Sequence, residues 1–207
     1  MSKLKSFLFI AAMLVAVSAS AQLSFGVKAG LNLSNISGDG ESLDSKIGFK
    51  IGPTVEFAIA PNMAIQSGLL LSSKGAKTSE SYSESGIDVD ADITINANYL
   101  ELPICFAYKY PIAPDTKIYV NAGPYLAYGL FGKTTAKISA MGLSAEEDED
   151  TLGDDGFENF DFGLTFGIGA EVTKFNFGLN YDLGLSEVIK DSKIKNTNFW
   201  ISVGYNF

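Results

Sequence analysis

Nine charged residues occupy polar positions in segments where polar and apolar residues alternate. Because they include both signs, ion pairing is the chemistry that these residue types offer. Three of the carboxylates, Glu56, Glu101 and Glu171, are expected in the half of the fold nearest the short turns, where two of them could act as general acid and base. The nine residues are Lys28, Lys50, Lys74, Lys109, Glu56, Glu101, Asp161, Glu171 and Asp182.

The chain contains no histidine and a single cysteine, Cys105. The lipid hydrolases and proteases that are built on small barrels use histidine as a base, so those mechanisms are closed to this protein. A zinc site made of cysteine and histidine and an internal disulfide are also excluded. We therefore expect no enzymatic activity and no cofactor.

An acidic run begins at Glu146 and is expected to be a solvated surface loop. Asp148 and Asp150, followed by Gly153, resemble the start of a calcium-binding loop. Leu152 and Asn159 stand where that motif requires ligands, so the match is poor. A weak divalent-cation site at Asp148 and Asp150 stays open as an alternative.

Residues 1–21 have the pattern of a secretory signal peptide, with two lysines before an apolar run over residues 7–17. The run is too short to cross a bilayer as a helix, which needs about 20 residues. We expect cleavage after Ala21 and a mature domain over residues 22–207. Cleavage removes two of the 15 basic residues and none of the 24 acidic ones, which leaves a net charge of −11 and argues against nucleic acid as a partner.

The rest of the chain alternates polar and apolar residues with a period of two, which predicts β-strands. The connections between these strands are alternately short turns and longer loops. We therefore predict an all-β fold, an eight-stranded antiparallel up-and-down transmembrane barrel. The longer loops are expected over 34–46, 75–92, 132–159 and 186–196. The strands are expected over 23–33, 47–59, 63–74, 99–108, 118–130, 160–172, 175–185 and 198–207.

Residue size indicates which face of the barrel points outward, although a soluble barrel alternates as well. The polar positions of each strand are mostly Gly, Ser, Thr and Asn, which suit a narrow interior. The alternate, apolar positions carry more large side chains than such an interior can hold, so we expect them to face lipid. Aromatic residues near the short turns are expected to form a girdle. They are Phe25, Phe57, Tyr108, Phe175, Phe177, Tyr205 and Phe207.

The segment before the fourth predicted strand has the opposite phase. Its isoleucines lie on the parity that is polar beyond Tyr99, so we expect a bulge or phase change between Ala97 and Tyr99. Residues 87–95 can pair with residues 134–141 as an extension above the membrane. Alternatively, the two segments add two strands to the barrel and raise its count to ten.

Several short motifs resemble those of a known family. They are the Ala21-Gln22 junction, G26-V-K-A-G-L-N-L33, Y99-L-E-L-P-I104, N121-A-G-P-Y125 and the terminal Phe207. The chain resembles the small outer-membrane β-barrel proteins of Gram-negative bacteria, in particular the porin-like barrel family common in Bacteroidetes. The resemblance implies a place in outer-membrane lipid and insertion by the outer-membrane assembly machinery, with Tyr205 and Phe207 as the assembly signal.

Two roles fit these observations. In the first, the interior charges pair with one another and fill the lumen, since isolated charges there would be costly. The protein is then a monomeric structural or surface-interaction barrel, with both termini in the periplasm and its long loops outside the cell. In the second, the lumen is a narrow porin-like passive channel. The sequence does not identify a ligand of the loops.

Overall fold

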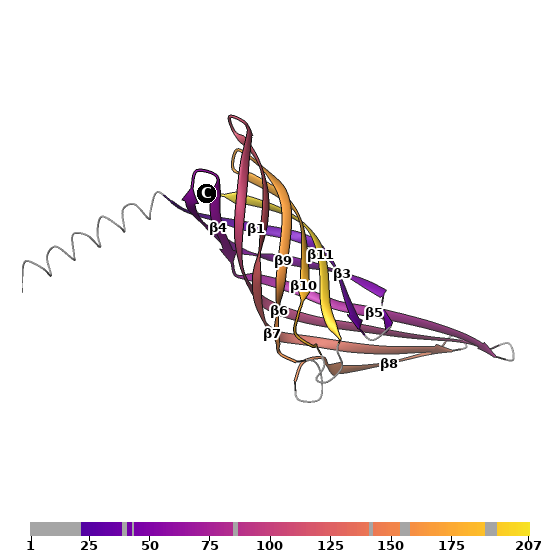
Figure 1. Cartoon of the computed structure of the whole chain (residues 1–207). Helices are drawn as coiled ribbons and strands as arrows, with labels where there is room; N and C mark the ends of the chain where they lie inside the picture. Colours follow the sequence, from indigo (N-terminus) through magenta and orange to yellow (C-terminus); the bar gives the residue numbers. More distant parts are fainter. Residues whose placement is uncertain are drawn as a thin grey trace, which may run out of the picture.

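The computed structural model describes residues 22–38, 41–42, 44–84, 87–140, 143–153, 158–188 and 194–207, and the predicted signal peptide lies outside these ranges. No helix in the described part is long and apolar enough to cross a membrane. The described residues form one antiparallel sheet (Figure 1). Its strands are β1 (Leu23–Gly38), β2 (Glu41–Ser42), β3 (Asp44–Ala60), β4 (Met63–Gly68), β5 (Leu70–Glu84), β6 (Ile87–Ala113), β7 (Thr116–Ala140), β8 (Leu143–Asp150), β9 (Phe160–Val172), β10 (Phe175–Gly184) and β11 (Lys195–Asn206).

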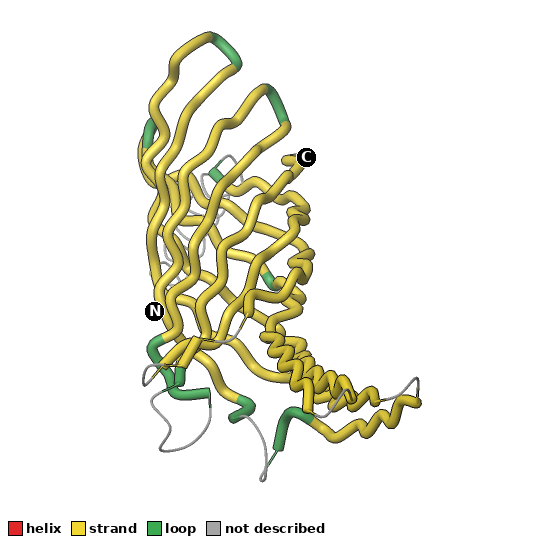
Figure 2. Tube along the Cα trace, turned by 90° about the vertical axis from the view of Figure 1, so that its right-hand side faces the viewer, coloured by secondary structure: helices red, strands yellow, loops and turns green. Residues whose placement is uncertain are grey.

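The sheet closes into a barrel because β11 pairs with β1, from Gly26 opposite Asn206 to Ser37 opposite Lys195. Around the ring the order is β1, β3, the pair β4 and β5, β6, β7, β9, β10 and β11. β2 pairs only with β1 and β8 only with β7, so neither belongs to the ring. The predicted eight-stranded antiparallel barrel is confirmed (Figure 2).

β4 and β5 form one barrel strand that is interrupted at Leu69. Gly68 lies opposite Thr54, so Leu69 faces Pro53 of β3, whose carbonyl accepts a hydrogen bond of 3.0 Å from the N–H of Leu69. On the other side, Pro103 of β6 lies at the same level. Proline has no N–H, so two donors of the ladder are missing here and the regular pairing is interrupted.

The two rims of the barrel differ. The predicted tight turns are confirmed at 61–62, 114–115 and 173–174, and they make the short-turn rim. At the other rim, most of the residues that we predicted as loops over 75–92 and 132–159 are strands. β5 and β6 continue as one hairpin and β7 and β8 as another, and both project far beyond the barrel (Figure 1).

These hairpins decide between the two strand counts. Val89 pairs with Ala140 and Ile95 with Thr134, so the segments extend the barrel strands and add no new ones. A register shift is present between Asn98 and Tyr99, as predicted. Its extra residue is Leu130 in β7, however, and β6 itself keeps an unbroken alternation.

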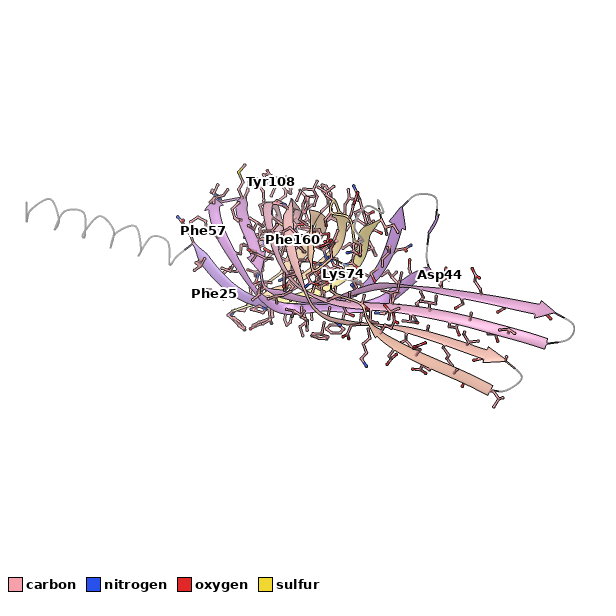
Figure 3. All side chains as sticks on the ribbon, turned by 90° about the horizontal axis from the view of Figure 1, so that it is seen from below. Phe25, Asp44, Phe57, Lys74, Tyr108 and Phe160 are labelled. Carbon is pink, nitrogen blue, oxygen red and sulfur yellow. The ribbon has the colours of Figure 1, made fainter. Side chains whose placement is uncertain are left out.

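The inside and outside of the wall have the predicted character. Figure 3 places Lys74 within the ring of strands and Phe25 and Phe57 at the outside of its wall. The large apolar side chains of the outer wall are exposed, whereas the interior is polar. Inward glycines make room for the larger interior rings. A Cβ atom on Gly163 would lie 2.7 Å from the ring of Tyr125, and one on Gly178 would lie 2.8 Å from the hydroxyl of Tyr119.

Candidate functional site

A central ion network crosses the lumen. Lys50 donates hydrogen bonds to Glu101 at 2.6 Å and to Asp182 at 2.7 Å. Lys74 lies 3.3 Å from the other oxygen of Glu101 and 3.1 Å from Asp161. The two ammonium groups therefore share Glu101 of neighbouring β6, and each also reaches across the lumen to a carboxylate of β10 or β9. All five side chains are almost completely buried, so every charge in the network is compensated within the protein.

Polar side chains complete the hydrogen bonding of this network. Asp161 accepts hydrogen bonds from Tyr125 at 3.3 Å, from Asn196 at 3.1 Å and from Ser186 at 2.7 Å. Asp182 accepts one of 3.0 Å from the amide of Asn198. These partners come from β7, from β11 and from the segment between β10 and β11, so the network links much of the ring and holds it in one register.

Aromatic rings face both lysines of the central network. The ammonium of Lys50 lies 4.6 Å from the ring centroid of Trp200. That of Lys74 lies 4.6 Å from the ring of Tyr125 and 5.3 Å from that of Tyr99. Cation–π attraction adds to the ion pairs, and the rings fill space that water would otherwise occupy. The cross-section is thus closed by side chains at this level.

A second network lies nearer the short-turn rim. Lys109 bridges two carboxylates, Glu56 and Glu171, at 2.5 Å each. Gln66 donates a hydrogen bond of 2.9 Å to Glu56 and accepts one of 2.7 Å from Asn121. We expected Glu101 in the half of the fold nearest the short turns, together with Glu56 and Glu171, but it belongs to the central network with Lys50 and Lys74. Because the strands are tilted, the height of a residue along the barrel axis does not follow from its position in the sequence alone.

Lys28 lies between the two networks, and no ion pair of its ammonium group occurs among the described residues. It lines a cavity of about 40 Å³ together with Glu56 and Glu171, and a second of about 40 Å³ together with Glu101. Its ammonium also lies 5.9 Å from the ring of Trp200. Lys28 therefore lies between carboxylates of the two networks, at distances longer than those of an ion pair. Each cavity is large enough for a water molecule or two.

An apolar cap covers the lumen at the hairpin rim. Ile36, Ala76 and Val188 are buried together, and partly buried Ile95, Leu152 and Ile194 pack against them. The segment that supplies Val188 is fixed by two backbone hydrogen bonds, one to Ile194 and one from Glu158. Sequence reasoning missed this cap, because its residues come from predicted loops and show no periodicity.

The geometry does not favour acid–base catalysis. The two carboxylates of the network near the short-turn rim, Glu56 and Glu171, are both bound by Lys109. Glu101 is bound by two lysines. A substrate would have to displace these ion pairs before it reached either group.

The acidic run lies outside the barrel, and the prediction that it is a loop is wrong for residues 143–150, which form β8. Asp148 accepts hydrogen bonds from Thr135 at 2.7 Å and from Lys133 at 3.4 Å. These contacts hold the pKa of Asp148 below its ordinary value. Asp150 pairs with Lys133 in the ladder. Within the described ranges, no three acidic, cysteine or histidine residues are grouped so that they could hold a metal ion.

The proposed assembly residues lie at the seam where the barrel closes. The rings of Tyr205 and Phe175 are 5.2 Å apart, and those of Tyr205 and Phe207 are 5.8 Å apart. The N–H of Phe207 donates a hydrogen bond of 2.9 Å to the carbonyl of Phe25. Six of the seven predicted girdle residues are exposed on the outer wall, and Tyr205 is half-buried.

Other proteins with this architecture are known. The chain matches the family described as outer membrane protein beta-barrel domain over residues 17–190. No curated protein matches its sequence.

Among solved structures, the chain is similar to Ail, the attachment invasion locus protein of Yersinia pestis, in complex with the heparin analogue sucrose octasulfate. The identity is 18%, the match covers 90% of this chain and 99% of Ail, and the TM-score is 0.41. It is also similar to Neisserial surface protein A, with 13% identity, coverage of 88% and 97%, and a TM-score of 0.44. For OprG of Pseudomonas aeruginosa the identity is 15%, the coverage 89% and 95%, and the TM-score 0.40. Since the family match spans most of its length, the chain belongs to the outer membrane protein beta-barrel domain family and resides in the outer membrane.

Proposed function

We propose that this protein is a non-conducting barrel that acts through the sheet it presents beyond the membrane. The proposal includes an orientation in which the short-turn rim faces the periplasm and the hairpins face the outside of the cell. The observation that carries it is the closure of the lumen. The two ion networks and the apolar cap occupy three successive levels of the barrel.

The alternative role, a narrow passive channel, requires a continuous water path. Around Lys28 the interior holds two cavities of about 40 Å³ each. Above them lie five buried charged side chains and the rings of Tyr99, Tyr125 and Trp200. An ion would have to break several buried ion pairs to pass, so the geometry supports the non-conducting role.

Single-channel recording in planar bilayers tests this proposal. We expect the wild-type protein to insert without conductance steps of porin size. The double variant Lys50→Ser/Glu101→Ser removes one charge of each sign from the central network and is expected to add small, brief openings. The matched control is Lys133→Ser/Asp148→Ser, which removes an exposed ion pair of the same type from the projecting hairpin. Stable, large steps from the wild type would refute the proposal.

A further inference from the structure

The four strand segments over 77–84, 87–96, 132–140 and 143–150 form a sheet that lies beyond the barrel, and we call it the projecting sheet (Figure 1). Paired residues of an antiparallel ladder point to the same face. The projecting sheet therefore has an inner face, which continues the lumen wall along β6, and an outer face, which continues the lipid-facing wall.

The centre of the inner face is apolar. In successive rows across β6, β7 and β8, Val89 pairs with Ala140 and Leu143 lies beyond it, while Ala91 pairs with Ile138 and Ala145 lies beyond it. Nearer the barrel, Ile93 pairs with Ala136. The larger of these side chains are exposed, with fractions of 39% for Ile93, 55% for Ile138 and 79% for Leu143. An exposed apolar surface of this kind marks a binding site.

The base of the same face shows what such a surface does when something covers it. Ile95 continues the row of Val89, Ala91 and Ile93, and it packs against the cap formed by Ile36, Ala76 and Val188. The covered part of the inner face is thus a hydrophobic core. The exposed part has the same composition but lacks a covering segment among the described residues.

Charges on the inner face all have one sign. The described acidic residues there are Glu80 on β5 and Glu147 and Glu149 on β8, which flank the apolar centre. Every lysine of the projecting sheet lies on the outer face, where Lys133 pairs with Asp148 at 3.4 Å. On the outer face lysines thus offset part of the acidic charge, whereas the inner face presents an apolar centre between acids.

From this arrangement we infer that the inner face binds a cationic amphipathic helix of a partner protein or peptide. Four strands about 4.8 Å apart give a surface about 15 Å wide, which accommodates one helix of about 10 Å diameter. Apolar residues of the helix would cover Ile93 and Ile138, and its Lys or Arg side chains would reach the flanking acids. The inference rests on the proposed role of the projecting sheet as the acting surface.

A second copy of this chain fits the surface less well. Face-to-face packing of two inner faces would bring their acidic residues together without a compensating lysine. Edge pairing through β8 would bring together strands with five consecutive acids, Glu146 to Asp150, and such charges oppose edge pairing. Charge complementarity therefore selects a cationic partner.

The test uses the whole protein in phosphatidylcholine nanodiscs and a labelled 18-residue helical peptide of leucine and lysine, with empty nanodiscs as the reference. We expect saturable binding, and at least tenfold weaker binding of the same peptide with glutamate in place of lysine. Ile93→Thr/Ile138→Thr, which keeps β-branched residues, is expected to weaken binding at least tenfold. Retained heat-modifiable mobility in gels shows that each variant is folded.

Two double variants with the same change in net charge separate the faces. On the inner face, Glu147→Gln/Glu149→Gln is expected to weaken binding three- to tenfold. On the outer face, Glu146→Gln/Asp150→Asn is expected to change it less than twofold. Equal effects of the two pairs, no saturable binding, or self-association abolished by Ile93→Thr/Ile138→Thr would each overturn the inference. A closed lumen in bilayer recordings would leave the proposed function standing in all three cases.

Discussion

β6 and β7 pass through two regions of the molecule in which their faces have opposite polarity. Inside the barrel, β6 turns Leu102, Ile104 and Phe106 outward and keeps Glu101 and Lys109 in the lumen. In the projecting sheet, the outward face of the same strand carries Asp90, Asp92 and Thr94, and the inward face is apolar. β6 has no bulge of its own between the two regions, so the exchange is made by the choice of residues.

The difference shows that alternation of polar and apolar residues predicts a strand but not which of its faces points outward. In the bilayer the apolar face must be the outer one, because lipid surrounds the barrel and polar groups can be satisfied only inside. Beyond the bilayer water reaches both faces, and the outer face becomes polar. That the inner face then becomes apolar is not required by the membrane, and this is why we assign it to a partner.

The largest expected difference between the regions concerns ion pairs. Glu101→Ala is expected to lower the free energy of unfolding by about 3 kcal/mol, because it leaves Lys50 and Lys74 buried with one carboxylate each. Asp148→Ala, which breaks the exposed pair of the projecting sheet, is expected to leave the free energy of unfolding almost unchanged. Urea unfolding of the protein in lipid vesicles measures both values.

Glu101→Gln serves as a second variant in case the alanine variant does not fold, since it keeps the shape of the side chain and removes only the charge. We expect its loss to lie between the other two. Similar losses for Glu101→Ala and Asp148→Ala would mean that the lumen is as hydrated as the projecting sheet, and the contrast between the two regions would fail.

The next effect concerns a charge on the outer face of β6. Ile104→Lys places an ammonium on the lipid-facing wall and is expected to cost about 2–4 kcal/mol if the residue lies near the middle of the bilayer. Thr94→Lys makes the same change on the same face of the same strand, ten residues away in the projecting sheet. There we expect a change within about 0.5 kcal/mol.

Both values come from vesicle unfolding, and proteoliposome flotation confirms that each variant has inserted. Equal costs at the two positions would contradict the placement of the membrane boundary between Thr94 and Ile104.

Much of this contrast could be read from the sequence. The period of two gave the eight barrel strands, the short turns and the inward position of all nine charged residues, because a side chain alternates strictly along a strand. The reversed phase before Tyr99 was visible too, and we expected a bulge or phase change there. Its correct reading needed the pairing partner, since the extra residue is Leu130 of β7.

The partners within the lumen could not be predicted in the same way. Parity places Glu101 and Lys50 inside, but only the stagger between strands brings them to one level and leaves Glu56 with Lys109. Loop residues such as Val188 lack any periodic signal, so the cap was missed. The same reason hid β8, whose acids were interpreted as a loop although Asp148 lies opposite Thr135 in a ladder.

A smaller effect is expected when one hairpin is shortened. Replacing residues 136–147 by Asn-Gly joins Thr135 to Asp148, which are paired partners, through a turn that favours a tight hairpin. The barrel is expected to keep its free energy of unfolding within about 1 kcal/mol, because the described residues among those removed belong to the projecting sheet. Binding of the leucine–lysine peptide is expected to be lost. A loss of more than about 2 kcal/mol would show that the two regions are not independent.

The smallest effect concerns the protonation of Asp148 on the outer face. The hydroxyl of Thr135 and the ammonium of Lys133 both donate to its carboxylate and lower its pKa. A lowered pKa means that these contacts stabilise the hairpin above the ordinary pKa of an aspartate and are lost as the pH falls through the value in the folded protein. Carbon-13 NMR titration of the carboxyl group is expected to show that Thr135→Val moves the pKa of Asp148 up, towards its ordinary value. Thr94→Val, on the neighbouring strand, serves as the control and is expected to leave the pKa of Asp148 in place.

Calcium added at neutral pH is expected to leave the Asp148 signal unchanged, because both carboxylate oxygens already accept hydrogen bonds within the hairpin. A saturable calcium-dependent shift of that signal would instead establish the cation site at Asp148 and Asp150, and the outer face would then also be a binding surface.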